Sequence, residues 1–167
     1  PQIINCTFKQ NRAGPPLSIT SSYGCGGAIY NGGGCYPSVI QCAFIENTSR
    51  YDGGAMYNDG GNPYLTNCIF QKNKSEKQHG GAIYNRGAQG TFINCLITYN
   101  TALATARHGG GIYNHASSPT IINCTLYGNE AGCIGDGVFN YQFSDPVITN
   151  CILWSYTGDS YPDVIYD

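Results

Sequence analysis

The sequence predicts an all-β fold in which the chain winds as a parallel solenoid of about six coils, each about 27 residues long and built from three short strands. Two observations predict this fold. The phrase GGAIYN, or a near copy of it, begins at residues 26, 53, 80, 109 and 135, so the intervals are 27, 27, 29 and 26 residues. A second phrase, built around a cysteine, occurs six times in the other half of the unit. A repeat of this length is typical of a solenoid.

The cysteine phrase places residues of one kind in equivalent positions. If each coil stacks on the previous one with parallel strands about 4.8 Å apart, these positions form ladders. The expected core ladder consists of Cys6, Cys42, Cys68, Cys95, Cys124 and Cys151. An Asn ladder directly before it consists of Asn5, Asn67, Asn94, Asn123 and Asn150, with Gln41 in the second copy. We expect these amides to donate to and accept from their copies one coil away, in a confined place.

Apolar rows predict which strand faces are buried. One row lies three residues before the cysteines, a second lies two residues after them, and a third lies within the glycine phrase at Ile29, Met56, Ile83, Ile112 and Val138. The first and third rows never admit a polar residue, so all three are expected to point inward with the cysteines. A further Asn follows each of the first five cysteines by five residues, at Asn11, Asn47, Asn73, Asn100 and Asn129.

Composition excludes several classes of protein. Charged residues make up 11% of the chain, against about 25% in an ordinary globular domain. The formal net charge of −2 argues against binding to nucleic acid or to an anionic membrane, because both need clustered Lys and Arg. No run approaches the roughly 18 apolar residues of a membrane span, and no sustained 3.6-residue period indicates helical repeats.

Residues 1–167 are expected to form a single domain with one inserted loop at about residues 12–24. The first interval between ladder cysteines is 36 residues, whereas the later ones are 26 to 29. Neither end resembles a cap, since Pro1 to Cys6 enters a repeat phrase at once and residues 161–167 read as a final strand. We therefore expect further coils to stack on the ends, from flanking segments of a longer chain or from another copy of this one.

The paired motifs GGA(I/L/V) and FxxN resemble the repeats of polymorphic outer-membrane proteins. Here they are Gly26–Ile29, Gly53–Met56 and Gly80–Ile83, with Phe8–Asn11, Phe44–Asn47 and Phe70–Asn73. The resemblance covers nearly the whole chain and implies a right-handed parallel β-helix of the broad pectin-lyase-like class. It also implies export, exposure at the cell surface and frequently adhesion.

Nine cysteines in an extracellular chain ordinarily suggest disulfides. Side chains in an in-register parallel ladder point the same way, so we favour buried thiols for the six ladder positions. Cys25, Cys35 and Cys133 lie off the ladder, and a Cys25–Cys35 bridge near the inserted loop is the open alternative. A zinc site is a weaker hypothesis, because cysteines spread along a column do not form a tetrahedral cluster.

Two columns of chemically varied side chains flank the glycine phrase. The column just before it reads Cys25, Asp52, His79, His108 and Ile134, and the column just after it reads Gly32, Asp59, Arg86, His115 and Tyr141. His79, His108 and Asp52 have the chemistry of a metal site, but stacked, water-exposed turn residues are the favoured interpretation. An extended strand would separate the two columns by about 20 Å, too far for a shared active site. No metal and no cofactor is therefore predicted.

An aromatic strip is the other candidate site, at Tyr30, Tyr57, Tyr84, Tyr113 and Phe139. Alternation from the inward Ile row predicts that these rings face outward. Ring contacts along the sheet explain the strip structurally. The functional interpretations are a platform for sugar rings or a lateral contact with another chain or a host-surface ligand.

Enzymatic activity is the less favoured hypothesis. Lyases on this fold need clustered carboxylates for calcium, and inverting hydrolases need two carboxyl groups about 6.5 to 9.5 Å apart. The Asp and Glu residues of this chain are scattered and recur in no column. The sequence thus predicts a non-catalytic structural or adhesive module, extracellular or at the cell surface, with polysaccharide binding or degradation as the alternative.

Overall fold

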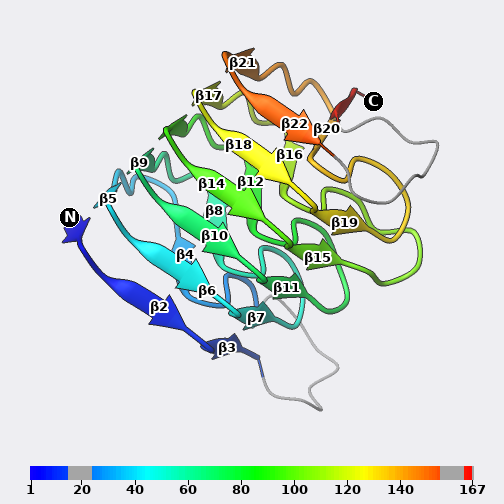
Figure 1. The fold of residues 1–167 in the computed structure, drawn as a ribbon, viewed down its shortest axis with the longest axis horizontal. Coiled ribbons are helices and arrows are strands. Elements are labelled where there is room, and N and C mark those ends of the chain that lie inside the picture. The colour runs from blue at the N-terminus through cyan, green and yellow to red at the C-terminus, as the bar shows by residue number, and fades with distance from the viewer. Residues whose placement is uncertain (15–23, 155–163, 167) are drawn as a thin grey trace.

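The structure, a computed structural model, describes residues 1–14, 24–154 and 164–166, and within them the chain forms the parallel strands β1 to β23. The coils stack side by side along the axis of the solenoid (Figure 1). Every strand pairs with the equivalent strand of a neighbouring coil, in register, as in Ile83 with Ile112 and Tyr84 with Tyr113. The predicted parallel solenoid is confirmed.

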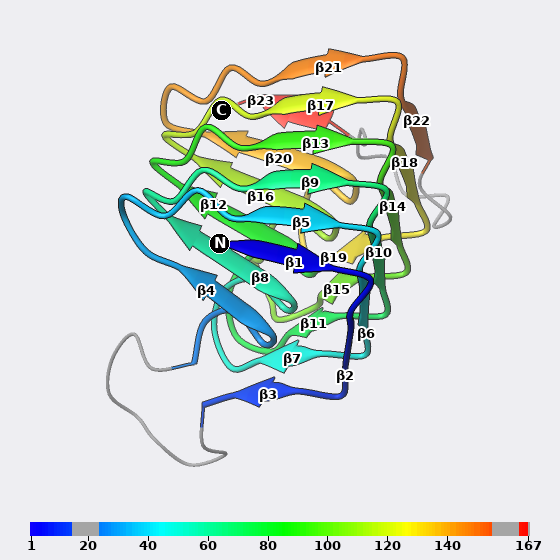
Figure 2. The ribbon, with the colours of Figure 1, turned by 90° about the vertical axis from the view of Figure 1, so that its left-hand side faces the viewer.

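The strands form four sheets, which make up the walls of the coil (Figure 2). Sheet A consists of β1 (Gln2–Ile4), β5 (Ser38–Ile40), β9 (Tyr64–Thr66), β13 (Thr91–Ile93), β17 (Thr120–Ile122) and β21 (Val147–Thr149). Sheet B consists of β2 (Thr7–Lys9), β6 (Ala43–Ile45), β10 (Ile69–Gln71), β14 (Leu96–Thr98), β18 (Thr125–Tyr127) and β22 (Ile152–Trp154). Sheet C consists of β3 (Arg12–Ala13), β7 (Thr48–Ser49), β11 (Lys74–Ser75), β15 (Thr101–Ala102) and β19 (Glu130–Ala131). Sheet D consists of β4 (Ile29–Asn31), β8 (Met56–Asp59), β12 (Ile83–Arg86), β16 (Ile112–His115), β20 (Val138–Tyr141) and β23 (Val164–Tyr166).

A coil therefore has four strands, and the prediction of three was wrong. The missed strands are the two-residue strands of sheet C, which are too short to show an alternating pattern in the sequence. Five coils have all four strands among the described residues, and β21, β22 and β23 belong to a sixth. The predicted final strand is confirmed by the pairing of Val164 with Val138. Of the predicted inserted loop, residues 15–23 lie outside the described residues.

The predicted Asn ladder was wrong in position. Asn5, Asn67, Asn94, Asn123 and Asn150 are exposed, and each has a left-handed φ of 52 to 54° at the corner between sheets A and B. Asn is favoured there because its short polar side chain tolerates the left-handed region. Within this row the side-chain bond is between Asn150 Nδ2 and Asn123 Oδ1, at 2.7 Å. These Asn residues are selected by backbone conformation.

Buried Asn ladders occupy two other rows. One runs through the Asn of the FxxN motif, and Asn73 shows its bonding: Nδ2 donates to Phe44 O and to Asn100 Oδ1, each at 2.9 Å. Its Oδ1 accepts from the backbone amide and the side chain of Asn47, each at 3.0 Å. The other row closes the glycine phrase, with side-chain bonds of 2.7 to 2.8 Å linking Asn31, Asn58, Asn85, Asn114 and Asn140. Every coil is thereby bonded to its neighbours through side chains inside the solenoid.

The core confirms the three inward apolar rows. Val39, Leu65 and Phe92 are fully buried in sheet A, as are the equivalent residues of sheets B and D. Phe44 and Phe70 stack with ring centroids 4.5 Å apart. In-register stacking places identical side chains at the spacing of the coils, which suits flat aromatic rings.

The cysteine ladder is buried in the inner coils and open at the ends. Cys42, Cys68, Cys95 and Cys124 are buried, whereas Cys6 is exposed and Cys151 half-buried because each lies in a terminal coil of the described solenoid. All nine cysteines of the chain are described, and all are free thiols, including Cys25 and Cys35. Each buried sulfur is near the carbonyl two residues before it, as Cys68 Sγ is to Thr66 O at 3.4 Å.

Across residues 1–14, 24–154 and 164–166, no helix is long and apolar enough to cross a bilayer.

Candidate functional site

A Gly-Gly pair shapes the entry to β4, β8, β12 and β16 of sheet D. The first glycine turns the chain, with φ of 65° at Gly53 and 69° at Gly80. The second lies against backbone, since a Cβ built on Gly54 would stand 2.0 Å from the carbonyl oxygen of Gly81 in the next coil. The turn brings the residue before the pair back over the outer face of sheet D.

The outer face of sheet D carries the predicted aromatic strip. Neighbouring rings stack along it, with centroids 5.2 Å apart between Tyr30 and Tyr57 and 5.0 Å apart between Tyr57 and Tyr84. The rings point away from the main core, as alternation predicted, and they form a separate cluster.

The expectation of an exposed strip was wrong for four of its five positions. Tyr30 is 52% exposed, whereas Tyr57, Tyr84, Tyr113 and Phe139 are between 2 and 6% exposed. Residues from the column before the glycines cover them, because the glycine turn folds that column back over the rings. Cys25, Ile134 and Tyr141 pack against this cluster. These ring faces are therefore not a platform on which a sugar could stack.

The column before the glycine pairs forms a ladder of backbone-to-side-chain bonds. The amide of His79 donates to Asp52 Oδ1 at 2.9 Å, and the amide of His108 donates to His79 Nδ1 at 3.1 Å. The two imidazole rings stack with centroids 5.4 Å apart. They also lie on the aromatic strip, with His79 4.4 Å from Tyr113 and His108 4.5 Å from Phe139. Among the described residues, no group of three or more His, Cys, Asp or Glu is arranged to hold a metal ion.

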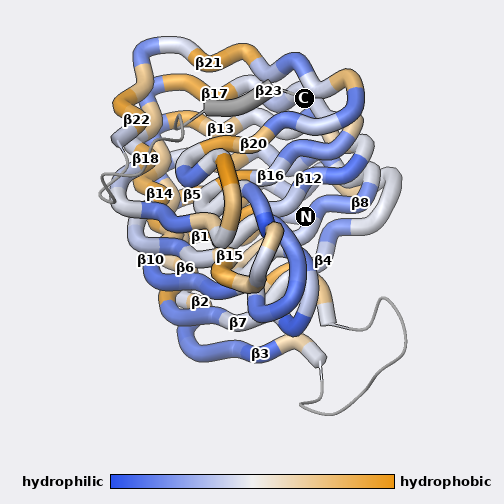
Figure 3. Tube along the Cα trace, turned by 90° about the vertical axis from the view of Figure 1, so that its right-hand side faces the viewer, coloured by the Kyte–Doolittle hydropathy of each residue, from blue (hydrophilic) through white to orange (hydrophobic). Residues whose placement is uncertain are grey.

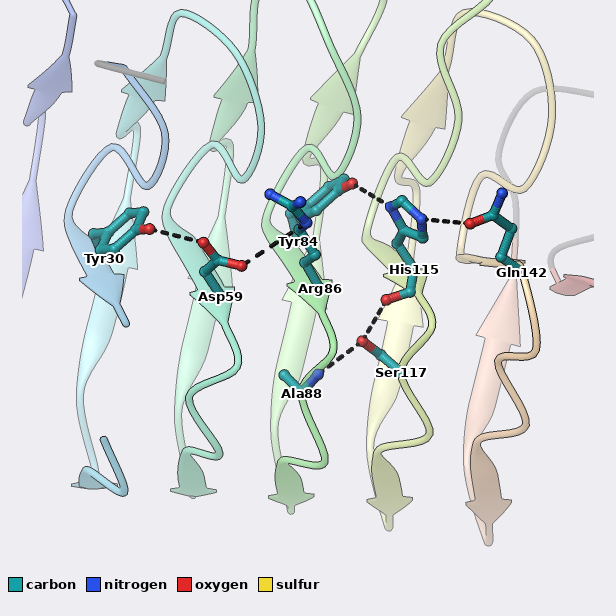
Figure 4. Close-up of polar contacts among 8 residues, drawn as sticks. All are labelled: Tyr30, Asp59, Tyr84, Arg86, Ala88, His115, Ser117 and Gln142. Carbon is teal, nitrogen blue, oxygen red and sulfur yellow. Dashed lines mark hydrogen bonds and ion pairs between the residues drawn. The ribbon is translucent and has the colours of Figure 1, made fainter. Parts of the chain in front are cut away.

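The column after the glycine phrase forms polar contacts across the coils (Figure 4). Tyr30 donates to Asp59 Oδ2 at 3.0 Å, and Asp59 Oδ1 lies 3.9 Å from Arg86 Nε. Farther along, Tyr84 Oη lies 3.2 Å from His115 Nδ1, and His115 Nε2 lies 2.8 Å from Gln142 Oε1. In the neutral His115 tautomer with Nε2 protonated, both contacts are hydrogen bonds.

The aromatic strip connects the two columns, which were predicted to be too far apart to share a site. His79 of the first column stacks on Tyr113, and His115 of the second column contacts Tyr84. A cavity of about 340 Å³ is lined from the first column by His79 and His108 and from the second by Tyr141. Tyr113, Phe139, Ala106 and Arg107 complete its lining.

Sequence reasoning missed Arg107 and the loop that carries it. This loop follows β15, and Arg107 N donates to Ala104 O at 3.1 Å in its turn. The available signal was the position of Arg107 directly before His108, which belongs to the first column. Only the folded loop shows that Arg107 lines the same cavity as Tyr113 and Phe139.

Burial shifts the pKa values of titratable groups in the column before the glycine pairs. Loss of hydration lowers the pKa of His79 to about 4, so this imidazole is neutral at pH 7. Burial also raises the pKa of Asp52 to about 6, against a smaller lowering by the His79 amide and by the charge of Arg107. Loss of hydration is thus the largest influence on the pKa values of both His79 and Asp52.

The titration of Asp52 predicts a pH-dependent stability. Because its folded pKa lies above the ordinary 3.8, the stability that Asp52 contributes falls as the pH rises from about 4 to about 6. Asp52→Asn keeps the Oδ1 acceptor without the charge. We expect it to raise the free energy of unfolding by ~2 kcal/mol at pH 8 and to change it little at pH 4.

Urea titrations of both proteins at pH 4 and pH 8 measure this difference. The opposite titration of His79 is common to the two proteins and cancels. An equal effect of Asp52→Asn at both pH values would contradict the prediction.

Comparison with known proteins gives two family matches. The model of the Chlamydia polymorphic membrane protein repeat matches residues 5–32. The model of the right-handed β-helix region matches residues 53–159, which is more than half of the chain. No curated protein and no solved structure matches the chain. Together, the repeat, the four parallel sheets and the match over residues 53–159 show that this chain belongs to the right-handed β-helix family.

Proposed function

We propose that the chain is a non-catalytic adhesive module displayed at the cell surface. The two family matches indicate a surface or adhesin-like β-helix. The proposal of adhesion rests further on the side chains of the adjoining outer faces of sheets A and B. We call these two faces the contact surface.

The outer faces of sheets A and B are nearly uncharged. The middle residue of each strand points inward and the outer two point to solvent, as the burial patterns of β1 and β9 show. Among these outward residues, all of them described, Lys9 is the one charged side chain. Large apolar residues there are exposed by 38 to 64%: Ile4, Tyr64, Ile69, Leu96, Val147, Ile152 and Trp154. Hydrophobic, orange segments occur on β14, β21 and β22 (Figure 3), the strands that contain Leu96, Val147 and Ile152. Extended exposed apolar patches generally mark interaction sites.

The bonding of the carboxylates supports a non-catalytic role. Glu46 accepts from Gln10 at 3.0 Å, and Glu76 forms a bidentate pair with Arg12 at 2.8 and 3.0 Å. Asp136 accepts from the Ala131 amide at 2.8 Å. With Asp52 and Asp59, these five carboxylates all accept hydrogen bonds or ion pairs from other parts of the scaffold.

Adhesion to fixed epithelial cells, measured by flow cytometry with the fluorescently labelled protein, tests the proposal. The double variant Ile69→Lys/Leu96→Lys places two charges at adjacent outward positions, paired between β10 and β14. We expect it to lose most of the binding, whereas Gln89→Lys, on an exposed loop, retains it. Absence of binding by the unmodified protein, or equal binding by the double variant, would contradict the proposal.

The proposed partners at the ends are further β-helix coils, from flanking segments or from a second copy. The edge strands β1 to β4, β19 and β21 to β23 each pair on one side among the described residues. The core residues Ile3, Phe8, Ile148 and Leu153 are only partly buried. Exposed parallel edges with open core rows readily accept another strand. Sedimentation of the purified protein tests copy-to-copy stacking, which predicts a mass that grows with concentration. A single-chain mass at every concentration would contradict copy-to-copy stacking.

A further inference from the structure

The cavity above sheet D has the size of a small-molecule site. It lies between the loop that follows β15 and the outer faces of β16 and β20, and its volume is about 340 Å³. The loops after β15 and β19 project beyond the strands on this side of the solenoid (Figure 1). Ligand pockets in proteins generally begin at about 300 Å³. The cavity therefore suits one ring-sized molecule or the terminal unit of a chain.

The polar groups of this cavity favour an anion. Arg107 Nε is buried and has no hydrogen-bond partner among the described residues. A guanidinium stays charged at all physiological pH values and presents a planar fork of N–H donors that matches a carboxylate. Leaving such a buried donor unpaired is costly, so a ligand that accepts from it gains affinity.

His79 adds a neutral donor to the same wall. Its Nδ1 accepts from the His108 amide at 3.1 Å, which places the imidazole proton on Nε2. The neighbouring carboxylate, Asp52, already accepts from the His79 amide at 2.9 Å, and no carboxylate is among the described residues that line the cavity. The lining thus presents N–H donors and one positive charge.

Aromatic rings supply the apolar part of the lining. Tyr113 and Phe139 are buried under the imidazoles, but Tyr141 is only half-buried at the end of β20. Its ring meets His115 edge to face, with centroids 5.4 Å apart, and its hydroxyl accepts from Gln142 Nε2 at 3.3 Å. An amphipathic ring of this kind presents an apolar surface with a polar edge.

We propose that this cavity binds a single acidic sugar residue, with its carboxylate held by Arg107 and its ring packed against Tyr141. Sugars combine apolar C–H faces with hydroxyl groups, which fits a lining of one aromatic residue and several N–H donors. The site lies on sheet D and is separate from the contact surface on sheets A and B, so either proposal can fail without the other.

Titration of the complete chain with glucuronate and with N-acetylneuraminate, followed by NMR chemical shifts, tests this assignment. Glucose is the matched neutral ligand, and inorganic sulfate is the simple anion. We expect saturable binding of at least one acidic sugar, with shifts confined to the cavity lining, and binding of glucose and sulfate at least about tenfold weaker.

Two variants and one control complete the test. Arg107→Gln and Tyr141→Ala are each expected to weaken binding about tenfold or more, whereas Arg86→Gln, which removes an exposed charge from the same face outside the cavity, leaves it unchanged. Thermal unfolding of each variant verifies that it is folded. The assignment is overturned if neither acidic sugar binds, if glucose or sulfate binds as tightly, or if Arg107→Gln binds as the unmodified protein does.

Discussion

Gly54→Ala is expected to destabilise the protein by about 4 kcal/mol or more. The added Cβ would stand 2.0 Å from Gly81 O, 2.6 Å from Lys74 N and 2.7 Å from Lys74 C. All three contacts are with backbone, and Gly81 belongs to the next coil. The spacing of the coils is set by their parallel hydrogen bonds, so relief of the clash would disrupt pairing on both sides of the substitution. For a chain of this length, such a loss lowers the melting temperature by roughly 10 °C.

Gly87→Ala is the matched control for Gly54→Ala. Gly87 also lies next to sheet D, and its φ of 58° is left-handed, but a Cβ there would meet no atom within 4 Å. We expect only the backbone cost of about 1 kcal/mol. Thermal and urea unfolding of both variants measure the difference. Equal losses for the two variants would show that close packing between the coils is not the reason why glycine recurs at the second position of the first four copies of the phrase.

Asn73→Ala is expected to cost about 4 kcal/mol. Asn73 is fully buried, and the substitution removes the acceptor for the Asn47 amide and the donor to Phe44 O. Each buried group left without a partner costs about 1 to 3 kcal/mol. Because the bonds connect three successive coils, the loss also weakens the contact between them.

Asn67→Ala and Asn67→Gly are the controls for Asn73→Ala, since Asn67 is exposed and has a φ of 54°. Alanine there should cost about 1 kcal/mol for the left-handed backbone, and glycine should cost almost nothing. Urea titrations measure the free energy of unfolding of Asn73→Ala and of the two Asn67 variants. A large loss in Asn67→Gly would mean that the amide of this row, and not its backbone conformation, stabilises the coil.

The glycine phrase shows how far the sequence predicts the candidate site. Its period correctly placed Tyr57, Tyr84 and Tyr113 in one row and directed them away from the core. It did not predict their burial, because the cover comes from loops whose path depends on the turn at each glycine pair. Arg107 has no equivalent in the other copies, so no repeat pattern could single it out.

The sequence by itself determined the repeat, the all-β class, the three inward apolar rows and the in-register stacking of equivalent residues. A residue that recurs once per coil must lie one strand spacing from its copy, so these features follow from the period and from alternation along a strand. Only the tertiary structure decided which Asn rows are bonded, since Asn67 and Asn73 recur equally regularly but occupy a left-handed corner and the interior respectively. It also decided where His79, Arg107 and Tyr141 meet, because that junction joins three coils through loops whose shape no period prescribes.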